Sequence, residues 1–205
     1  GSFDIEKFEK ALTDRTKIVA ITHMSNVLGT VVPIKEVIRI AHGRGIPVLV
    51  DGSQGAVHLD IDVRALDVDF YIFTGHKTYG PTGIGVLYGK REWLEKLPPF
   101  NGGGEMIETV TMDSVTYNVP PHRFEAGTPP IVQAIGLGAA MDYMMAVGRD
   151  RIRAHENTAP CAIQTIHPGH GMLPVRFRGI RQGKKFGQVT IRQCLDRQPG
   201  TRHAL

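Results

Sequence analysis

The segment FTGHKTYGPTGIG, residues 73–85, places a lysine between an apolar run and a loop punctuated by glycines. A lysine acts as a nucleophile near neutral pH only when desolvation or nearby positive charge activates its amine, and its most frequent cofactor use is an imine to pyridoxal phosphate. A single loop lysine is more often simply solvated. Chemistry at Lys77 is therefore indicated only if the other groups that this cofactor requires occur with it.

Those other groups are found in two short stretches of the chain. Pyridoxal phosphate needs a carboxylate at its ring nitrogen, donors around its phosphate and a partner for its phenolic oxygen. Asp51 has the chemistry for the ring nitrogen, and Gln54, three residues later, for the phenolic oxygen. Thr74 and His76 flank Lys77 closely enough to donate to the phosphate. Their joint occurrence indicates a pyridoxal-phosphate site.

The hydrophobic pattern predicts alternating strands and helices that would position these residues. Residues 17–26 form an apolar run rich in β-branched side chains, which is typical of a buried strand. Residues 33–45 begin with proline, repeat apolar side chains at helical spacing and end with glycines. Three further strands are predicted at residues 46–54, 69–77 and 83–90. This order predicts an α/β fold with a mostly parallel sheet flanked by helices.

In sheets of this kind, ligands bind outside the carboxyl ends of the strands. We therefore expect six polar side chains on one rim of the sheet: Asn26, Asp51, Gln54, Thr74, His76 and Lys77. The rest of the pattern predicts a short helix at residues 91–97, a flexible loop at residues 98–105 and a long helix at residues 129–148.

The composition limits the class of protein. The chain has 41% hydrophobic residues and no apolar stretch near the roughly 20 residues of a membrane span, so we expect no membrane partner. Two cysteines make no disulfide framework, which favours a reducing cytoplasm. Residues 157–205 carry eight Lys or Arg and one acid. Such a charge can mark a nucleic-acid arm, but we interpret it as accidental and expect no nucleic-acid partner.

Several motifs resemble one known family. VDGSQ followed by DFYIFTGHKTYGPTGIGVLY resembles the pyridoxal-phosphate region of the class V aminotransferase superfamily, most closely the SufS-like group II cysteine desulfurases. THMSNVLGTVVPI, EMIETV and RFEAGTPP are similar to further stretches of that family. The resemblance identifies residues 1–156 as part of the large, cofactor-binding domain of a fold-type I enzyme. Residues 157–205 do not resemble the family, and a shifted reading frame is our hypothesis for their origin.

The resemblance implies a role for each matching residue. Lys77 matches the lysine that forms the imine with pyridoxal 5′-phosphate and shuttles protons, and Asp51 matches the partner of the ring nitrogen. Gln54 matches the contact on the phenolate side. Thr74 and His76 match phosphate ligands. The implied reaction converts L-cysteine to L-alanine and keeps the sulfur as an enzyme-bound persulfide for iron–sulfur cluster assembly, with a sulfur-acceptor protein as a further partner.

Two further residues match positions outside this cofactor set. Asn26 matches a residue near the substrate carboxylate. Thr128 matches a threonine that reaches the phosphate of the neighbouring subunit, which implies a homodimer with shared sites.

The family pattern is incomplete in this chain. Neither Cys161 nor Cys194 has the sequence context of the family's persulfide cysteine, so we expect this chain not to complete desulfuration. A selenocysteine lyase or another class V aminotransferase-like enzyme remains an alternative. A second alternative, of a different class, is a non-catalytic remnant or an interaction fragment that pairs with an intact subunit.

Overall fold

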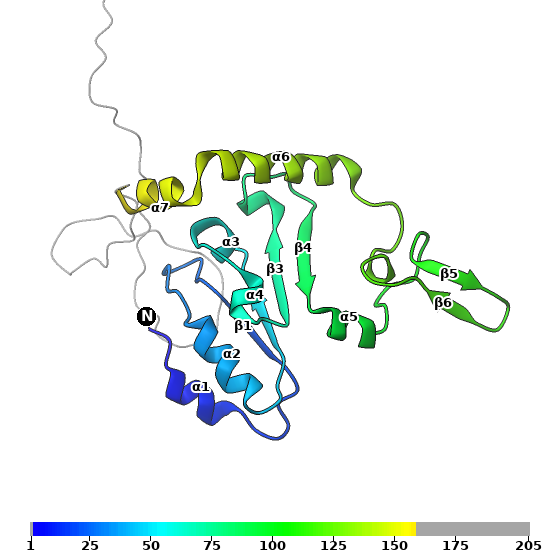
Figure 1. The fold of residues 1–205 in the computed structure, drawn as a ribbon, viewed down its shortest axis with the longest axis horizontal. Helices are drawn as coiled ribbons and strands as arrows, with labels where there is room; N and C mark the ends of the chain where they lie inside the picture. Colours follow the sequence, from blue (N-terminus) through cyan, green and yellow to red (C-terminus); the bar gives the residue numbers. More distant parts are fainter. Residues whose placement is uncertain (1, 159–205) are drawn as a thin grey trace, which may run out of the picture. The chain divides into compact units, whose positions relative to one another are not determined.

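The first of two compact units of the chain, Gly1–Ile152, contains a four-stranded sheet (Figure 1); the second unit is Arg153–Leu205. The computed structural model describes residues 2–158. The strands lie side by side in sequence order: β1 (Val19–Thr22), β2 (Val48–Asp51), β3 (Phe70–Thr74) and β4 (Gly85–Gly89). The first three run parallel, and β4 is antiparallel to β3. The predicted α/β fold with a mostly parallel sheet is therefore confirmed.

The reversal at β4 follows from the length of its connection. Residues 75–84 link β3 directly to β4, whereas a parallel neighbour needs a crossover of a dozen or more residues. The Gly75 N–H donates to the Ile84 carbonyl over 2.9 Å, and Thr74 pairs with Gly85. The lysine-bearing loop is therefore also the hairpin loop of this strand pair.

Helix α2 (Ile34–His42) connects β1 to β2 and supplies much of the core. Pro33 stands at its N-cap and Gly43 at its C-cap, so the predicted boundaries are confirmed. Its apolar side chains pack in one cluster with Val48 and Val50 of β2. The buried residues of the helix are Ile34, Val37, Ile38, Ile40 and Ala41. Burying a Val or Ile side chain contributes roughly 1.5–3 kcal/mol, so this helix stabilises the pairing of the two strands that flank it.

The remaining elements connect and extend the sheet. In chain order they are α1 (Ile5–Ala11), α3 (Gly55–His58), α4 (Val63–Leu66), η1 (Gly75–Lys77), α5 (Arg91–Lys96), β5 (Ile107–Val110), β6 (Val115–Tyr117), η2 (His122–Phe124), α6 (Ile131–Val147) and α7 (Arg149–Thr158). The two helices predicted after β4 are confirmed as α5 and α6, whereas α1 and the hairpin of β5 and β6 were not predicted. Within residues 2–158 no single helix could cross a membrane, although α6 and α7 reach the required length and composition as a bent pair.

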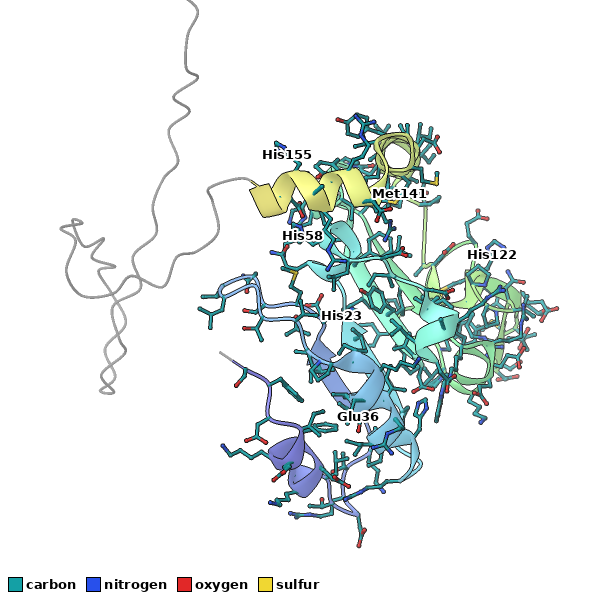
Figure 2. All side chains as sticks on the ribbon, turned by 60° about the vertical axis from the view of Figure 1, so that its left-hand side comes forward. His23, Glu36, His58, His122, Met141 and His155 are labelled. Atoms are coloured by element: carbon teal, nitrogen blue, oxygen red, sulfur yellow. The ribbon has the colours of Figure 1, made fainter. Side chains whose placement is uncertain are left out.

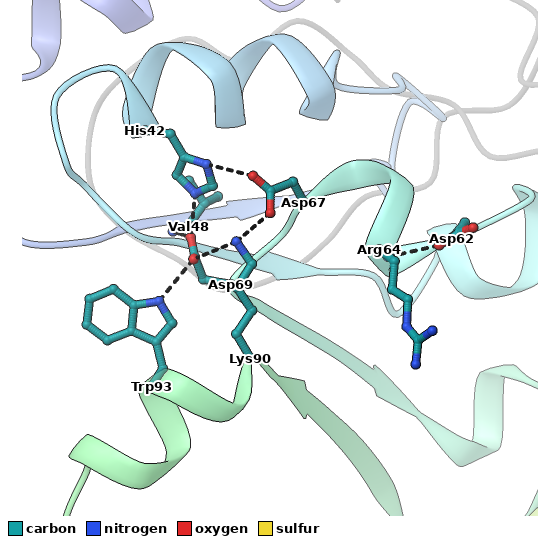
Figure 3. A network of polar contacts seen from close by, with 8 residues as sticks. All are labelled: His42, Val48, Asp62, Arg64, Asp67, Asp69, Lys90 and Trp93. Atoms are coloured by element: carbon teal, nitrogen blue, oxygen red, sulfur yellow. Dashed lines mark hydrogen bonds and ion pairs between the residues drawn. The ribbon is translucent and has the colours of Figure 1, made fainter.

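A buried carboxylate, Asp69, joins the amino ends of the parallel strands to the elements around them (Figure 3). Its Oδ2 accepts hydrogen bonds from the Val48 N–H over 2.7 Å and from His42 Nε2 over 2.8 Å. Its Oδ1 accepts one from Trp93 Nε1 over 3.0 Å, and Lys90 Nζ lies 3.3 Å from the same oxygen. This carboxylate therefore connects β2, α2 and α5 at the edge opposite the carboxyl ends.

Replacing Asp69 by alanine is expected to lower the free energy of unfolding by about 3 kcal/mol. The Val48 N–H and the Trp93 indole N–H would lose their acceptor at a residue that is only 3% exposed. Asp67 is a matched control, because it pairs with Lys90 at 2.6 Å but its side chain is 67% exposed. Asp67→Asn, a residue type that tolerates the left-handed φ of 56° at this position, should therefore cost less than about 1 kcal/mol. Urea unfolding measures both variants, and equal losses would contradict this role of Asp69.

The same carboxylate is expected to make the fold sensitive to acid. Burial raises the pKa of Asp69, but hydrogen bonds from His42, the Val48 N–H and Trp93 outweigh it, so the pKa lies below the ordinary 3.8. A carboxylate with a lowered folded-state pKa contributes stability above its unfolded-state pKa and loses it as the pH falls through the folded-state pKa. The urea concentration at the midpoint of unfolding should therefore decrease as the pH is lowered below about 4. The decrease should be less steep in Asp69→Ala. An equally steep decrease in the wild type and in Asp69→Ala would contradict this role of the Asp69 carboxylate.

Candidate active site

The turns after β2 and β3 lie at the carboxyl ends of two adjacent parallel strands. Asp51, the last residue of β2, pairs with Ile72, and β3 continues to Thr74. From these ends the chain passes through Gln54 into α3 and through η1 to Lys77. The structure therefore brings the residues predicted around the lysine to one edge of the sheet, while their roles in binding stay predictions.

Asp51 is held by its backbone and by one side-chain oxygen. Its carbonyl accepts the His23 N–H over 2.8 Å, and its Oδ1 accepts the Ser53 N–H over 2.9 Å. Its other oxygen, Oδ2, accepts no hydrogen bond from residues 2–158, and the residue is half-buried. The carboxylate therefore presents one fixed, open acceptor, which is what a protonated ring nitrogen needs.

Lys77 ends the short helix η1 and is half-buried. In the described part of the chain its amine forms no ion pair with a carboxylate. The next residue, Thr78, is buried, and its hydroxyl donates to the Gly75 carbonyl over 3.0 Å. The backbone around the lysine is thus fixed, while no acidic residue described here holds its amine away from a cofactor aldehyde.

The side chains of Thr74 and His76 contact each other through Oγ1 and Nδ1, which lie 2.8 Å apart. If the hydroxyl donates, the imidazole keeps its proton on Nε2. If Nδ1 donates, the hydroxyl keeps its own hydrogen. Either arrangement leaves one donor for an anion, which fits the phosphate contact predicted for these two residues.

The loop that carries the lysine is closely packed and strained. A Cβ at position 75 would lie 2.8 Å from Ile84 Cγ2, so only glycine fits there. Tyr79 has a φ of 60°, in the left-handed region, which costs a residue with a side chain roughly 1–2 kcal/mol. Its ring packs edge-on against Tyr143 of α6 at 6.1 Å between centroids. Such strain persists only where packing fixes the conformation.

Two of the predicted site residues lie outside this pair of turns. Asn26 is exposed beyond β1, in a turn where Ser25 Oγ accepts the N–H groups of Val27 and Leu28. Thr128 is exposed before α6, and its side chain forms no hydrogen bond within residues 2–158. Their contacts with a substrate carboxylate and with a neighbouring subunit's phosphate stay predictions.

Two buried polar residues beside the Asp51 turn, Tyr71 and His23, were missed by sequence reasoning (His23 is labelled in Figure 2). They are 3% and 7% exposed, and the tyrosine hydroxyl lies 3.2 Å from His23 Nδ1. Burial raises the pKa of Tyr71 and lowers the pKa of His23. The only sequence signal was a polar group interrupting each apolar run, which is equally typical of an exposed position.

The chain belongs to the class V aminotransferase family, whose model matches residues 1–166. It is 54% identical over 157 residues to a probable cysteine desulfurase of Streptomyces coelicolor, a match that covers 77% of this chain and 38% of that protein. The chain therefore spans about two fifths of the length of the curated relatives it matches.

Solved structures show the same likeness. The cysteine desulfurase CsdA from Escherichia coli superposes with a TM-score of 0.70 at 46% identity, over 72% of this chain and 37% of that one. A variant of C-DES with glycine covalently linked to its PLP cofactor superposes with a TM-score of 0.66 at 30% identity, over 73% of this chain and 41% of that one. The predicted boundary at residue 156 stays a prediction, because residues 159–205 lie outside the described part of the chain.

Proposed function

We propose that this chain is the pyridoxal-phosphate-binding part of a cysteine desulfurase, which converts L-cysteine to L-alanine and retains the sulfur as a persulfide. The observation that carries the proposal is the open Oδ2 of Asp51 at the same sheet edge as Lys77. The substrate is inferred from the names of relatives, such as the 54% identical probable cysteine desulfurase.

The residues at this edge have the chemistry that the cofactor requires. When bound, pyridoxal phosphate supplies an electron sink for negative charge at the substrate α-carbon. Asp51 Oδ2 would keep a proton on the ring nitrogen, and the amide of Gln54 would contact the phenolic oxygen. The donor left free by Thr74 and His76 would bind the phosphate. Lys77 would hold the cofactor covalently, and its amine would move a proton at the substrate α-carbon.

Finer features of the proposal follow from the same resemblance. The enzyme would be of the SufS-like group II type, act in the cytoplasm, supply sulfur for iron–sulfur clusters through an acceptor protein, and work as a homodimer with Thr128 reaching the partner's phosphate. Exposed apolar side chains on α6 support an association surface. They are Ile131, Val132, Ile135, Tyr143 and Met145.

Covalent attachment of the cofactor at Lys77 tests the proposal. Pyridoxal phosphate is added to the purified chain, the product is reduced with borohydride, and peptide mass mapping locates the adduct. We expect it at residue 77, with complete loss in Lys77→Ala. Lys96 serves as the control, because its amine lies over the Trp93 ring at 5.1 Å, away from this edge, and Lys96→Ala should keep the adduct. An undiminished adduct in Lys77→Ala would refute the assignment.

A further inference from the structure

The turn that carries Asp51 and Gln54 rests on the ring of Tyr71. A Cβ at position 52 would lie 2.0 Å from the ring atoms Cε1 and Cζ of this tyrosine. A Cβ at position 55 would lie 2.9 Å from its hydroxyl oxygen. Because both positions are glycine, the turn backbone approaches the buried ring more closely than any other residue type allows.

His23, the residue after β1, completes the support of this turn. Its Nδ1 lies 3.2 Å from the Tyr71 hydroxyl, and the two rings meet edge-on at 82°. The same Nδ1 lies 3.1 Å from the position of a Cβ on Gly55, and the His23 N–H donates to the Asp51 carbonyl over 2.8 Å. The histidine therefore contacts the turn through both its side chain and its backbone.

The hydrogen bond of this pair joins two uncharged side chains. Burial raises the pKa of Tyr71, with Arg149 lowering it and Asp51 raising it again, and burial lowers the pKa of His23. Both side chains are therefore neutral at neutral pH. The phenol hydroxyl and Nδ1 therefore share one hydrogen bond between neutral groups, in which the histidine tautomer decides which of the two donates.

We propose that Tyr71 and His23 are positioning residues whose hydrogen bond fixes the turn so that Asp51 and Gln54 meet the cofactor ring. This inference rests on the proposed function, and it requires neither Tyr71 nor His23 to contact the cofactor. Loss of the phenol hydroxyl would leave the buried Nδ1 of His23 without its hydrogen-bond partner. The turn would then gain freedom at the residues that must align with the ring.

Amide hydrogen exchange on the cofactor-free chain is the first test. In Tyr71→Phe the turn amides of Ser53 and Ala56 should exchange about tenfold faster than in the wild type. The Val48 amide at the opposite edge should not change. Tyr88→Phe is the matched control, because Tyr88 of β4 pairs with Tyr71 of β3 and its hydroxyl forms no hydrogen bond in residues 2–158.

Cofactor affinity of two His23 variants is the second test. His23→Asn places an amide close to the position of Nδ1, where its oxygen can accept or its N–H can donate, and should bind pyridoxal phosphate nearly as tightly as the wild type. His23→Leu fills the space with apolar atoms and should bind about tenfold more weakly, as should Tyr71→Phe. A role in packing alone predicts the reverse order for the two His23 variants, because leucine is closer to histidine in size.

Two results would overturn the positioning role. The first is that the turn amides of Ser53 and Ala56 exchange at the same rate in Tyr71→Phe as in Tyr88→Phe. The second is that His23→Leu binds the cofactor as tightly as His23→Asn or more tightly. If the wild type fails to attach the cofactor at Lys77, the proposed function is refuted instead, and the exchange measurement still decides whether the pair fixes the turn.

Discussion

Asp51→Asn is expected to weaken binding of pyridoxal phosphate by roughly 10- to 100-fold while the fold and attachment at Lys77 are retained. The amide matches the carboxylate in shape and can still accept the Ser53 N–H that now bonds to Oδ1. It carries no charge, so the charge-assisted hydrogen bond to the ring nitrogen, worth about 1.5–3 kcal/mol, is lost.

Titration of the cofactor by visible absorbance measures this loss. Asp60→Asn is the matched control, because Asp60 is exposed in the same connection between β2 and β3. We expect no change in affinity for this control. Unchanged affinity in Asp51→Asn, with an intact fold by circular dichroism, would show that the carboxylate does not meet the ring.

Gly52→Ala is expected to destabilise the chain by about 3 kcal/mol and to prevent cofactor binding. The added methyl carbon would lie 2.0 Å from atoms of the buried Tyr71 ring, so either the ring or the turn must move. The Gly52 N–H donates to the Ile72 carbonyl over 2.8 Å, which ties the turn to β3. Displacement of this residue therefore also displaces the adjacent Asp51.

A double-mutant cycle separates this clash from other causes. In a Tyr71→Leu background the ring is absent, so Gly52→Ala should cost at least 1 kcal/mol less than in the wild type. Gly138→Ala, in α6 with no atom within 4 Å of the new methyl, is the control and should stabilise by about 0.5–1 kcal/mol. Additive costs at positions 52 and 71 would contradict the contact.

The central sheet was predictable because its elements are marked by strong local patterns. The buried face of α2 repeats at helical spacing between Pro33 and Gly43, and β2 and β3 are short apolar runs. The hairpin of β5 and β6 was missed because its strands are only four and three residues long and are mostly exposed. Helix α1 was missed although Asp4 caps it, because it has no fully buried residue.

Some residues of the candidate site could also be predicted from the sequence, and others could not. Asp51 ends the apolar run of β2, and Lys77 lies three residues after the end of β3, so the parallel pairing of these strands brings both turns to one edge. Tyr71 and His23 come together from β3 and from the residue after β1, a contact between residues 48 positions apart. No local pattern encodes such a pair. The requirement for glycine at positions 52 and 55 follows only from their contact with the Tyr71 side chain.

A crystal structure of the chain grown with pyridoxal phosphate would test the central claim most directly. We predict continuous electron density from Lys77 Nζ to the cofactor, with Oδ2 of Asp51 within about 3.2 Å of the ring nitrogen. Cofactor density at another lysine, or a ring nitrogen out of reach of Asp51, would contradict it.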